Sequence, residues 1–169
     1  MPGDAPQTMS ERTVSFLVRG GSPCEVLLGL KKRGFGAGKY AGIGGKIKAG
    51  ETITRAAVRE LEEEIGIAAQ ERDLKAMGRL TFLFPAQPGW NQVVYPFVIA
   101  AWQGEPRESV EMQPAWYDVR QIPFDKMWQD ARLWLPHVLQ GKPVRMRFVF
   151  AADHETVDEW GWEEQPEVL

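Results

Sequence analysis

The sequence predicts an α/β protein whose strands and helices pack in layers within one domain. Short runs rich in Val, Leu and Phe indicate strands, a long amphipathic stretch indicates a helix, and no linker divides the 169 residues. An apolar fraction of 44% is ordinary for a globular domain with a real core. We expect residues 1–11 to be a flexible N-terminal arm, residues 12–162 to be the domain and residues 163–169 to be a tail.

The first part of the chain predicts two strands, a glycine-rich loop and a third, shorter strand. Residues 13–18 and 25–30 are the two strands. The loop from Arg33 to Tyr40 lacks the Lys-Ser/Thr ending of a P-loop, so we do not interpret it as one. Residues 42–47 are predicted to form the short strand, which leads into a helix.

That helix has recognisable ends and a clear apolar side. Thr52 fits an N-cap, and Gly66 stands where a left-handed C′ residue is expected, with Ile67 closing the end. The apolar residues recur every four positions and predict one buried stripe. They are Ile53, Ala57, Leu61 and Ile65.

The remainder of the chain predicts more strands and a second helix. Period-two patterns, turn residues and an Ile-Pro break separate these elements. They are strands at 76–84 and 93–102 joined by the turn PAQPGWN, a polar connection from Glu105 to Pro114, a short strand at 115–119, a helix at about 125–140, and a closing hairpin made by RMRFVFA and TVDEW.

Three carboxylates of the first helix are expected to share one patch. Glu60, Glu63 and Glu64 are spaced i, i+3, i+4, whereas Glu62 lies roughly 200° round the helix from Glu60 and should face solvent. Like charges this close repel one another, and a divalent cation would neutralise them. Oxygen ligands select hard cations, Mg²⁺ first with Mn²⁺ as the usual substitute, and Mg²⁺ commonly completes its shell with substrate phosphate.

An acidic run on a helix is, by itself, most often a solvated face. The neighbouring glycines, Glu51 and Arg59 reverse that interpretation. Arg59 has no reason to stand inside an acidic cluster unless it orients carboxylates through charge-assisted hydrogen bonds.

The whole segment resembles the Nudix box, G-x5-E-x7-R-E-U-x-E-E-x-G-U. The matching residues are Gly45, Glu51, Arg59, Glu60, Leu61, Glu63, Glu64, Gly66 and Ile67. The resemblance implies an α/β/α sandwich with a mixed central sheet, and a metal-dependent hydrolase of a nucleoside diphosphate linked to another group. It further implies metal ligation by Glu60, Glu63, Glu64 and a backbone carbonyl near Gly45, with Glu51 and Arg59 bracing the site. Either Glu63 or Glu64 would be the general base.

The similarity extends from about Thr13 to Phe150. The segments LLGLKKRGFGAGKY and EMQPAWYDVRQIPFDKMWQDARLWLP resemble MutT-type members of the family that act on oxidised purine nucleoside triphosphates. The resemblance implies a base pocket. It also implies one further carboxylate near the metals, Glu111, which could equally be an ordinary surface loop residue. The pocket positions are Lys31, Phe35, Ala41, Phe82, Phe84, Met112, Trp128 and Asp130. For each aromatic taken alone, ordinary core is the alternative.

Two positions depart from that pattern. Ala41 and Ala131 stand where these relatives have an asparagine and a second aspartate. A single ionised Asp130 can accept hydrogen bonds but cannot donate one, which suits a guanine-type edge and predicts a preference for 8-oxo-dGTP over 2-hydroxy-dATP. The alternatives are broad nucleotide acceptance, another Nudix substrate such as a dinucleoside polyphosphate, ADP-ribose or a capped RNA end, and a non-catalytic sensor domain.

Composition bounds the partners and the compartment. The net charge of −3 and the absence of a basic stripe argue against a nucleic-acid polymer, and no apolar run is long enough to span a membrane. Cys24 is the only cysteine, so we expect a buried structural thiol in a cytoplasmic protein. The cluster Lys31-Lys32-Arg33 is either a solvated loop or an attractor for a triphosphate. The sequence does not indicate an oligomeric state.

Overall fold

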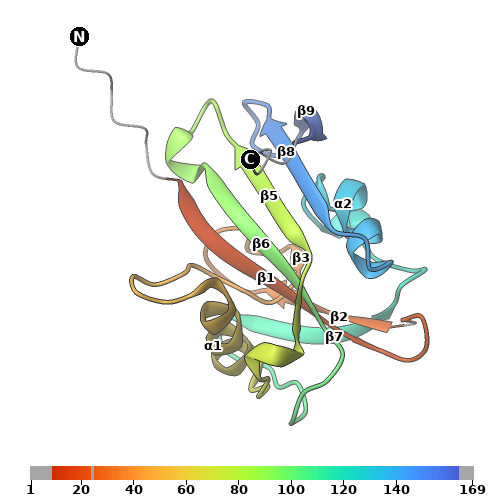
Figure 1. Cartoon of the computed structure of the whole chain (residues 1–169). Coiled ribbons are helices and arrows are strands. Elements are labelled where there is room, and N and C mark those ends of the chain that lie inside the picture. Colours follow the sequence, from red (N-terminus) through yellow and green to blue (C-terminus); the bar gives the residue numbers. More distant parts are fainter. Residues whose placement is uncertain (1–8, 24, 164–169) are drawn as a thin grey trace, which may run out of the picture.

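The computed structural model describes residues 9–23 and 25–163 and shows a nine-stranded sheet with helices packed against it (Figure 1). The strands are β1 (Ser10–Arg19), β2 (Glu25–Lys31), β3 (Tyr40–Ala41), β4 (Leu74–Ala76), β5 (Gly78–Leu83), β6 (Gln92–Ile99), β7 (Met112–Asp118), β8 (Val144–Phe150) and β9 (Val157–Trp162). The α-helices are α1 (Ile53–Ile65) and α2 (Ala131–Leu139). Single 3₁₀ turns are η1 (Glu71–Asp73), η2 (Pro88–Trp90) and η3 (Phe124–Lys126).

The main path of the sheet runs β3-β2-β1-β6-β5-β8-β9, with β4 paired to β6 and β7 paired to β2. The β1–β6 and β5–β8 pairs are parallel, and the other strand pairs are antiparallel. The sheet is therefore mixed, as expected. The hairpins predicted around PAQPGWN and at the end of the chain are confirmed as β5–β6 and β8–β9.

Side-chain alternation along the central strands builds one core on each face of the sheet. Phe16 and Val18 of β1 pack in the core that contains α2, whereas Leu17 between them packs in the core that contains α1. Successive side chains of a strand point to opposite faces, so the two helices cover opposite faces. The α/β/α sandwich is confirmed.

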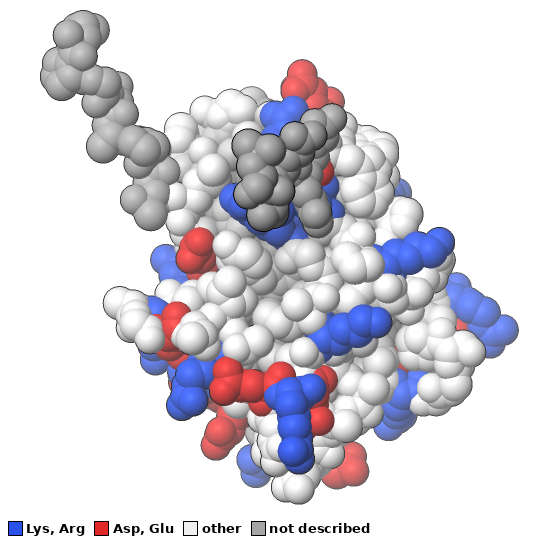
Figure 2. Space-filling model, in the orientation of Figure 1, with Lys and Arg blue, Asp and Glu red and all other residues white. Residues whose placement is uncertain are grey.

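Helix α1 has the ends that the sequence predicts. The Thr52 hydroxyl accepts the N–H of Arg55 at 3.2 Å, and Gly66 adopts a left-handed φ of 69° while its N–H bonds the carbonyl of Glu62. Ala57, Leu61 and Ile65 are buried, and Glu62 is exposed. On the face shown in Figure 2, acidic and basic side chains lie interspersed over the region that α1 occupies in Figure 1.

Residues 42–47 do not form the predicted strand. Regular pairing ends after β3, and isolated bridges at Ile43 and Lys46 connect this segment to β1. Gly44 lies so close to β1 that a Cβ would stand 1.8 Å from the carbonyl oxygen of Thr13. This close approach explains the glycine at position 44.

The second helix is shorter than predicted. A 3₁₀ turn at Phe124–Lys126 replaces its first residues, Met127 is extended, and α2 begins only at Ala131. The extended stretch directs Met127 and Trp128 into a pocket, which a continuous helix would not do for both.

Several other boundaries differ from the prediction. The predicted strand 76–84 is divided at Met77 into β4 and β5, and Gly78 follows with a positive φ of 107°. Strand β7 begins at Met112 rather than at 115, because Lys31 of β2 pairs with it there. Ser10 and Glu11 of the expected arm belong to β1. Cys24 lies outside the described residues.

In the described ranges, neither α-helix has the length and apolar character that crossing a membrane requires.

The packing of α1 depends on Leu61, which is fully buried against the sheet. We expect Leu61→Ala to lower the free energy of unfolding by about 2–5 kcal/mol, because it removes buried methyl groups and leaves a cavity. Urea denaturation measures this. Val110→Ala, at a side chain that is 68% exposed, is the matched control and should change little.

Candidate active site

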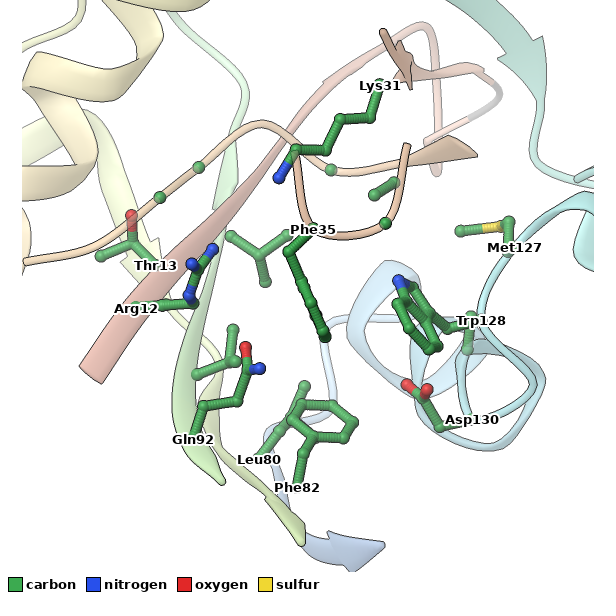
Figure 3. A pocket seen from close by; sticks show the side chains of 18 of the residues that line it. Arg12, Thr13, Lys31, Phe35, Leu80, Phe82, Gln92, Met127, Trp128 and Asp130 are labelled. Atoms are coloured by element: carbon green, nitrogen blue, oxygen red, sulfur yellow. The ribbon is translucent and has the colours of Figure 1, made fainter. Parts of the chain in front are cut away.

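A pocket extends from Glu64 of α1 to a cluster of aromatic side chains. Figure 3 shows Phe35, Phe82 and Trp128 of this cluster, with Arg12 and Lys31 on the other side of Phe35 from Trp128. Glu64, Gly44 and Gly45 line one end, and Phe82, Trp128 and Asp130 line the other. Every residue predicted to bind substrate lines this pocket: Lys31, Phe35, Ala41, Phe82, Phe84, Met112, Trp128 and Asp130. The pocket is lined by residues from seven strands, both helices and the intervening loops.

Arg59 connects the carboxylates at the first end. Its Nε and Nη2 donate to the two oxygens of Glu51 at 2.7 and 2.9 Å, and its Nη1 donates to Glu60 at 3.0 Å and to Glu63 at 3.1 Å. Nη2 also donates to the carbonyl of Lys46 at 3.0 Å. The hydrogen bonds from Arg59 lower the pKa of Glu51 to about 2. Glu51 and Arg59 thus stand where they can brace the loop against α1.

Glu64 is a partly buried carboxylate that lies beside Glu60. Its Oε2 is enclosed and makes no hydrogen bond among the described residues. Burial raises the pKa of Glu64 to about 8, and the charge of Glu60 adds to that rise. A bound divalent cation would compensate both effects.

Gly45 leaves room beside Glu60. A Cβ at position 45 would stand 2.6 Å from Oε1 of Glu60. The carbonyl of Gly45 accepts the N–H of Thr13 at 3.0 Å and keeps a second lone pair. Glu60, Glu64 and this carbonyl supply the oxygen donors that a hard cation prefers, so the residues fit a divalent metal.

Two other predicted metal ligands face solvent. The side chains of Glu63 and Glu111 are 53% and 45% exposed, and Glu111 pairs with Arg33 at 2.9 Å. In the described ranges, no three His, Cys, Asp or Glu side chains already form a metal cage. Ion binding by Glu63 or Glu111 would therefore require side-chain rotation, and their metal roles stay predictions.

At the other end, Trp128 lies in an aromatic cluster. Phe35 stacks on it with ring centroids 5.2 Å apart, and the ammonium of Lys39 lies 5.0 Å from its ring. Phe84 is 2% exposed and stacks on Phe150, so it is also a core residue. A purine that stacks on Trp128 must use the face away from Phe35 or displace Phe35.

Asp130 is the buried polar group of the aromatic end. Trp134 donates its indole N–H to Oδ2 of Asp130 at 2.6 Å. Burial raises the pKa of Asp130 to about 6, although the bond from Trp134 opposes the rise. Ala41 and Ala131 line the same pocket and add no polar side-chain group there.

The basic residues Lys31, Lys32 and Arg33 at the end of β2 lie in two different environments. Lys31 lines the pocket. Lys32 pairs with Glu108 at 3.3 Å, and Arg33 pairs with Glu111, so these two residues attach the glycine-rich loop to the segment before β7. Of the three residues, Lys31 alone lines the pocket, and its attraction of a triphosphate stays a prediction.

Several pocket residues were not predicted from the sequence. Those with polar or aromatic side chains are Arg12, Thr13, Phe16, Tyr40, Gln92, Trp134 and Phe150. The i, i+4 spacing of Asp130 and Trp134 was a usable signal, because a buried indole N–H needs an acceptor. No local pattern marks Arg12, whose place depends on strand pairing.

The α/β/α sandwich and the carboxylate-bearing helix beside an aromatic pocket are the features of a Nudix domain. The chain matches the NUDIX domain model over residues 9–138, and it belongs to the Nudix family. It is 45% identical over 137 residues to an oxidized purine nucleoside triphosphate hydrolase of Danio rerio, covering 81% of this chain and 85% of that protein. It is 42% identical over 149 residues to the Mus musculus protein of the same name, covering 88% and 93%.

The fold is also similar to the crystal structure of a MutT protein from Bacillus halodurans. The TM-score is 0.78 at 21% identity, and the match covers 94% of this chain and 100% of that chain.

The raised pKa of Glu64 predicts that the free energy of unfolding of the metal-free protein depends on pH. The folded state holds the Glu64 proton more tightly than the unfolded state, so stability falls as the pH rises from about 4.5 to about 8. Glu64→Gln should remove this cost and stabilise the metal-free protein above that window by on the order of 2 kcal/mol, or roughly 4–8 °C. Thermal unfolding in a chelator across this pH range measures it.

The matched control is Glu62→Gln, at the exposed glutamate of the same helix, which should show no such gain. Added Mg²⁺ should raise the unfolding temperature of the unsubstituted protein more than that of Glu64→Gln. Equal pH profiles for all three proteins would contradict the prediction.

Proposed function

We propose that this protein is a Mg²⁺-dependent pyrophosphohydrolase of oxidised purine nucleoside triphosphates, such as 8-oxo-dGTP. Water attacks the phosphate chain, one bridging P–O bond breaks, and a nucleoside monophosphate and pyrophosphate are released. The observation that carries the proposal is a pocket that is lined by Glu64 at one end and by stacking aromatics and the buried Asp130 at the other. The names of the Danio rerio and Mus musculus relatives support it.

The aromatic end suits a purine base. Trp128 offers a stacking surface, which contributes about 1–3 kcal/mol per base in single-strand recognition. The ionised form of Asp130 accepts N–H groups from a guanine-type edge, and Trp134 holds the carboxylate in place through Oδ2. The base would thus be oriented by one carboxylate oxygen within an apolar enclosure.

The carboxylate end suits the phosphate chain. Glu60, Glu63, Glu64 and the carbonyl of Gly45 are the proposed metal ligands, with Glu111 a further candidate. Magnesium, when bound, supplies charge neutralisation of the phosphates and a water of lowered pKa. Glu63 or Glu64 takes the proton from the attacking water. Arg59 holds Glu60 and Glu63 in register along α1.

Broader nucleotide acceptance is the second candidate. Ala41 and Ala131 line the pocket and offer no side-chain donor or acceptor. The pocket therefore makes fewer hydrogen bonds to the base than one with an asparagine and an aspartate at these positions would. Other Nudix substrates, such as ADP-ribose or a dinucleoside polyphosphate, and a non-catalytic sensor role are further alternatives. The complete set of box glutamates argues against a sensor. Nucleotide binding in Mg²⁺ without product would identify one.

Substitution of the candidate bases tests the chemistry. Glu63→Gln and Glu64→Gln should each lower kcat by about 10²- to 10⁴-fold, because each removes a carboxylate that accepts a proton or holds the metal. Initial rates of pyrophosphate release measure this. Glu62→Gln should retain activity, since Glu62 is exposed on the other side of α1. Full activity in both active-site variants would refute the assignment.

Base selection should depend on the protonation of Asp130. At about pH 8, kcat/KM for 8-oxo-dGTP should exceed that for 2-hydroxy-dATP by roughly tenfold or more, because an ionised carboxylate only accepts. As the pH falls through about 6, the protonated acid becomes a donor and the ratio should fall. Competition between both substrates in one reaction measures the ratio.

Asp130→Asn provides the matched variant, since its amide offers both a donor and an acceptor at every pH. Its substrate ratio should be smaller and independent of pH. A wild-type ratio near one at pH 8 would favour the broader specificity.

A further inference from the structure

Arg12 points into the pocket beside the carboxylate end. Arg12, Val14 and Phe16 are alternate residues of β1, and all three line the pocket. In Figure 3 the guanidinium of Arg12 and the ammonium of Lys31 both point toward the space next to Phe35, on the side away from Trp128. The guanidinium carbon lies 5.9 Å from the centre of the Phe35 ring.

Among the described residues, the guanidinium of Arg12 makes no hydrogen bond and no ion pair within 4.0 Å, and the same holds for the ammonium of Lys31. Burial lowers the pKa of Arg12, and the nearest opposing charges are those of Glu60 and Glu64. The pKa of Lys31 is lowered by burial and then by the charge of Arg12. Two half-buried cations therefore face one region.

The other arginine at this end has a different environment. Arg59 uses its guanidinium on Glu51, Glu60, Glu63 and the carbonyl of Lys46. Arg12 has all its donors available, and a planar guanidinium matches the spacing of phosphate oxygens. Any cation that binds Glu60 and Glu64 also cancels the charges that now face Arg12. The donors of Arg12 then lack a compensating anion until a phosphate chain arrives.

We propose that Arg12 is a substrate-binding residue that contacts the phosphate chain of the nucleotide and favours a triphosphate over a monophosphate. This inference rests on the proposed function. Its position at the carboxylate end, remote from Asp130 and Trp128, assigns it to the phosphates rather than to the base. The ring of Phe35 flanks the guanidinium and helps to orient it.

The test compares affinities for a methylene-bridged, non-hydrolysable analogue of 8-oxo-dGTP and for 8-oxo-dGMP, by isothermal titration calorimetry in Mg²⁺. Arg12→Met should weaken binding of the triphosphate analogue by roughly 10- to 100-fold and leave the affinity for the monophosphate nearly unchanged. Arg12→Lys should recover part of the loss, since it restores the charge without the planar fork. Arg19→Met is the matched control on the same strand, because Arg19 pairs with Glu25 outside the pocket.

The outcomes separate the inference from the proposed function. If the wild-type protein binds and hydrolyses the triphosphate but Arg12→Met binds the analogue equally well, the assignment of Arg12 fails alone. Equal losses for both ligands also overturn it, because they indicate a structural role for Arg12 in the pocket. If the wild-type protein neither binds the analogue nor hydrolyses any nucleoside triphosphate, the proposed function fails and the assignment with it.

Discussion

The arrangement of the site depends on the guanidinium of Arg59. Like charges crowd one side of α1, and without a counter-charge they would repel one another and splay into solvent. Arg59 is 19% exposed and reaches Glu51, Glu60 and Glu63 together with a backbone carbonyl. The same contacts attach the loop before α1 to the helix. One side chain therefore positions both the carboxylates and the glycine-bearing segment beside them.

Each end of the pocket holds a carboxylic acid whose pKa is raised, but the surroundings of the two acids differ. Glu64 and Asp130 both have raised pKa values, and burial is the largest cause for each. Glu64 also faces Glu60, so a cation that bound both carboxylates would displace the proton of Glu64. Asp130 faces aromatic rings and one indole donor, so its protonation state changes which hydrogen bonds it can offer to a base.

The cations around the pocket differ in how they are partnered. Arg59, Lys32 and Arg33 are paired with carboxylates, and those pairs position α1 and the glycine-rich loop. Arg12 and Lys31 point inward and have no such pair among the described residues. Burying an unpaired charge lowers the stability of the folded protein. Binding of an anionic ligand therefore explains these two inward-pointing cations better than a contribution to folding does.

Sequence alone determined the features that arise within a few neighbouring residues. The four-residue apolar period and the capping residues predicted α1 with both ends, and the mixture of strand and helix patterns predicted layers of sheet and helices. Resemblance then named pocket residues that the structure does place together, from Lys31 to Asp130. The late start of α2, the short β3 and the inclusion of Arg12 and Phe150 in the pocket were decided only by tertiary structure. These features depend on contacts between residues far apart in the chain, and local propensity and periodicity carry no information about such pairings.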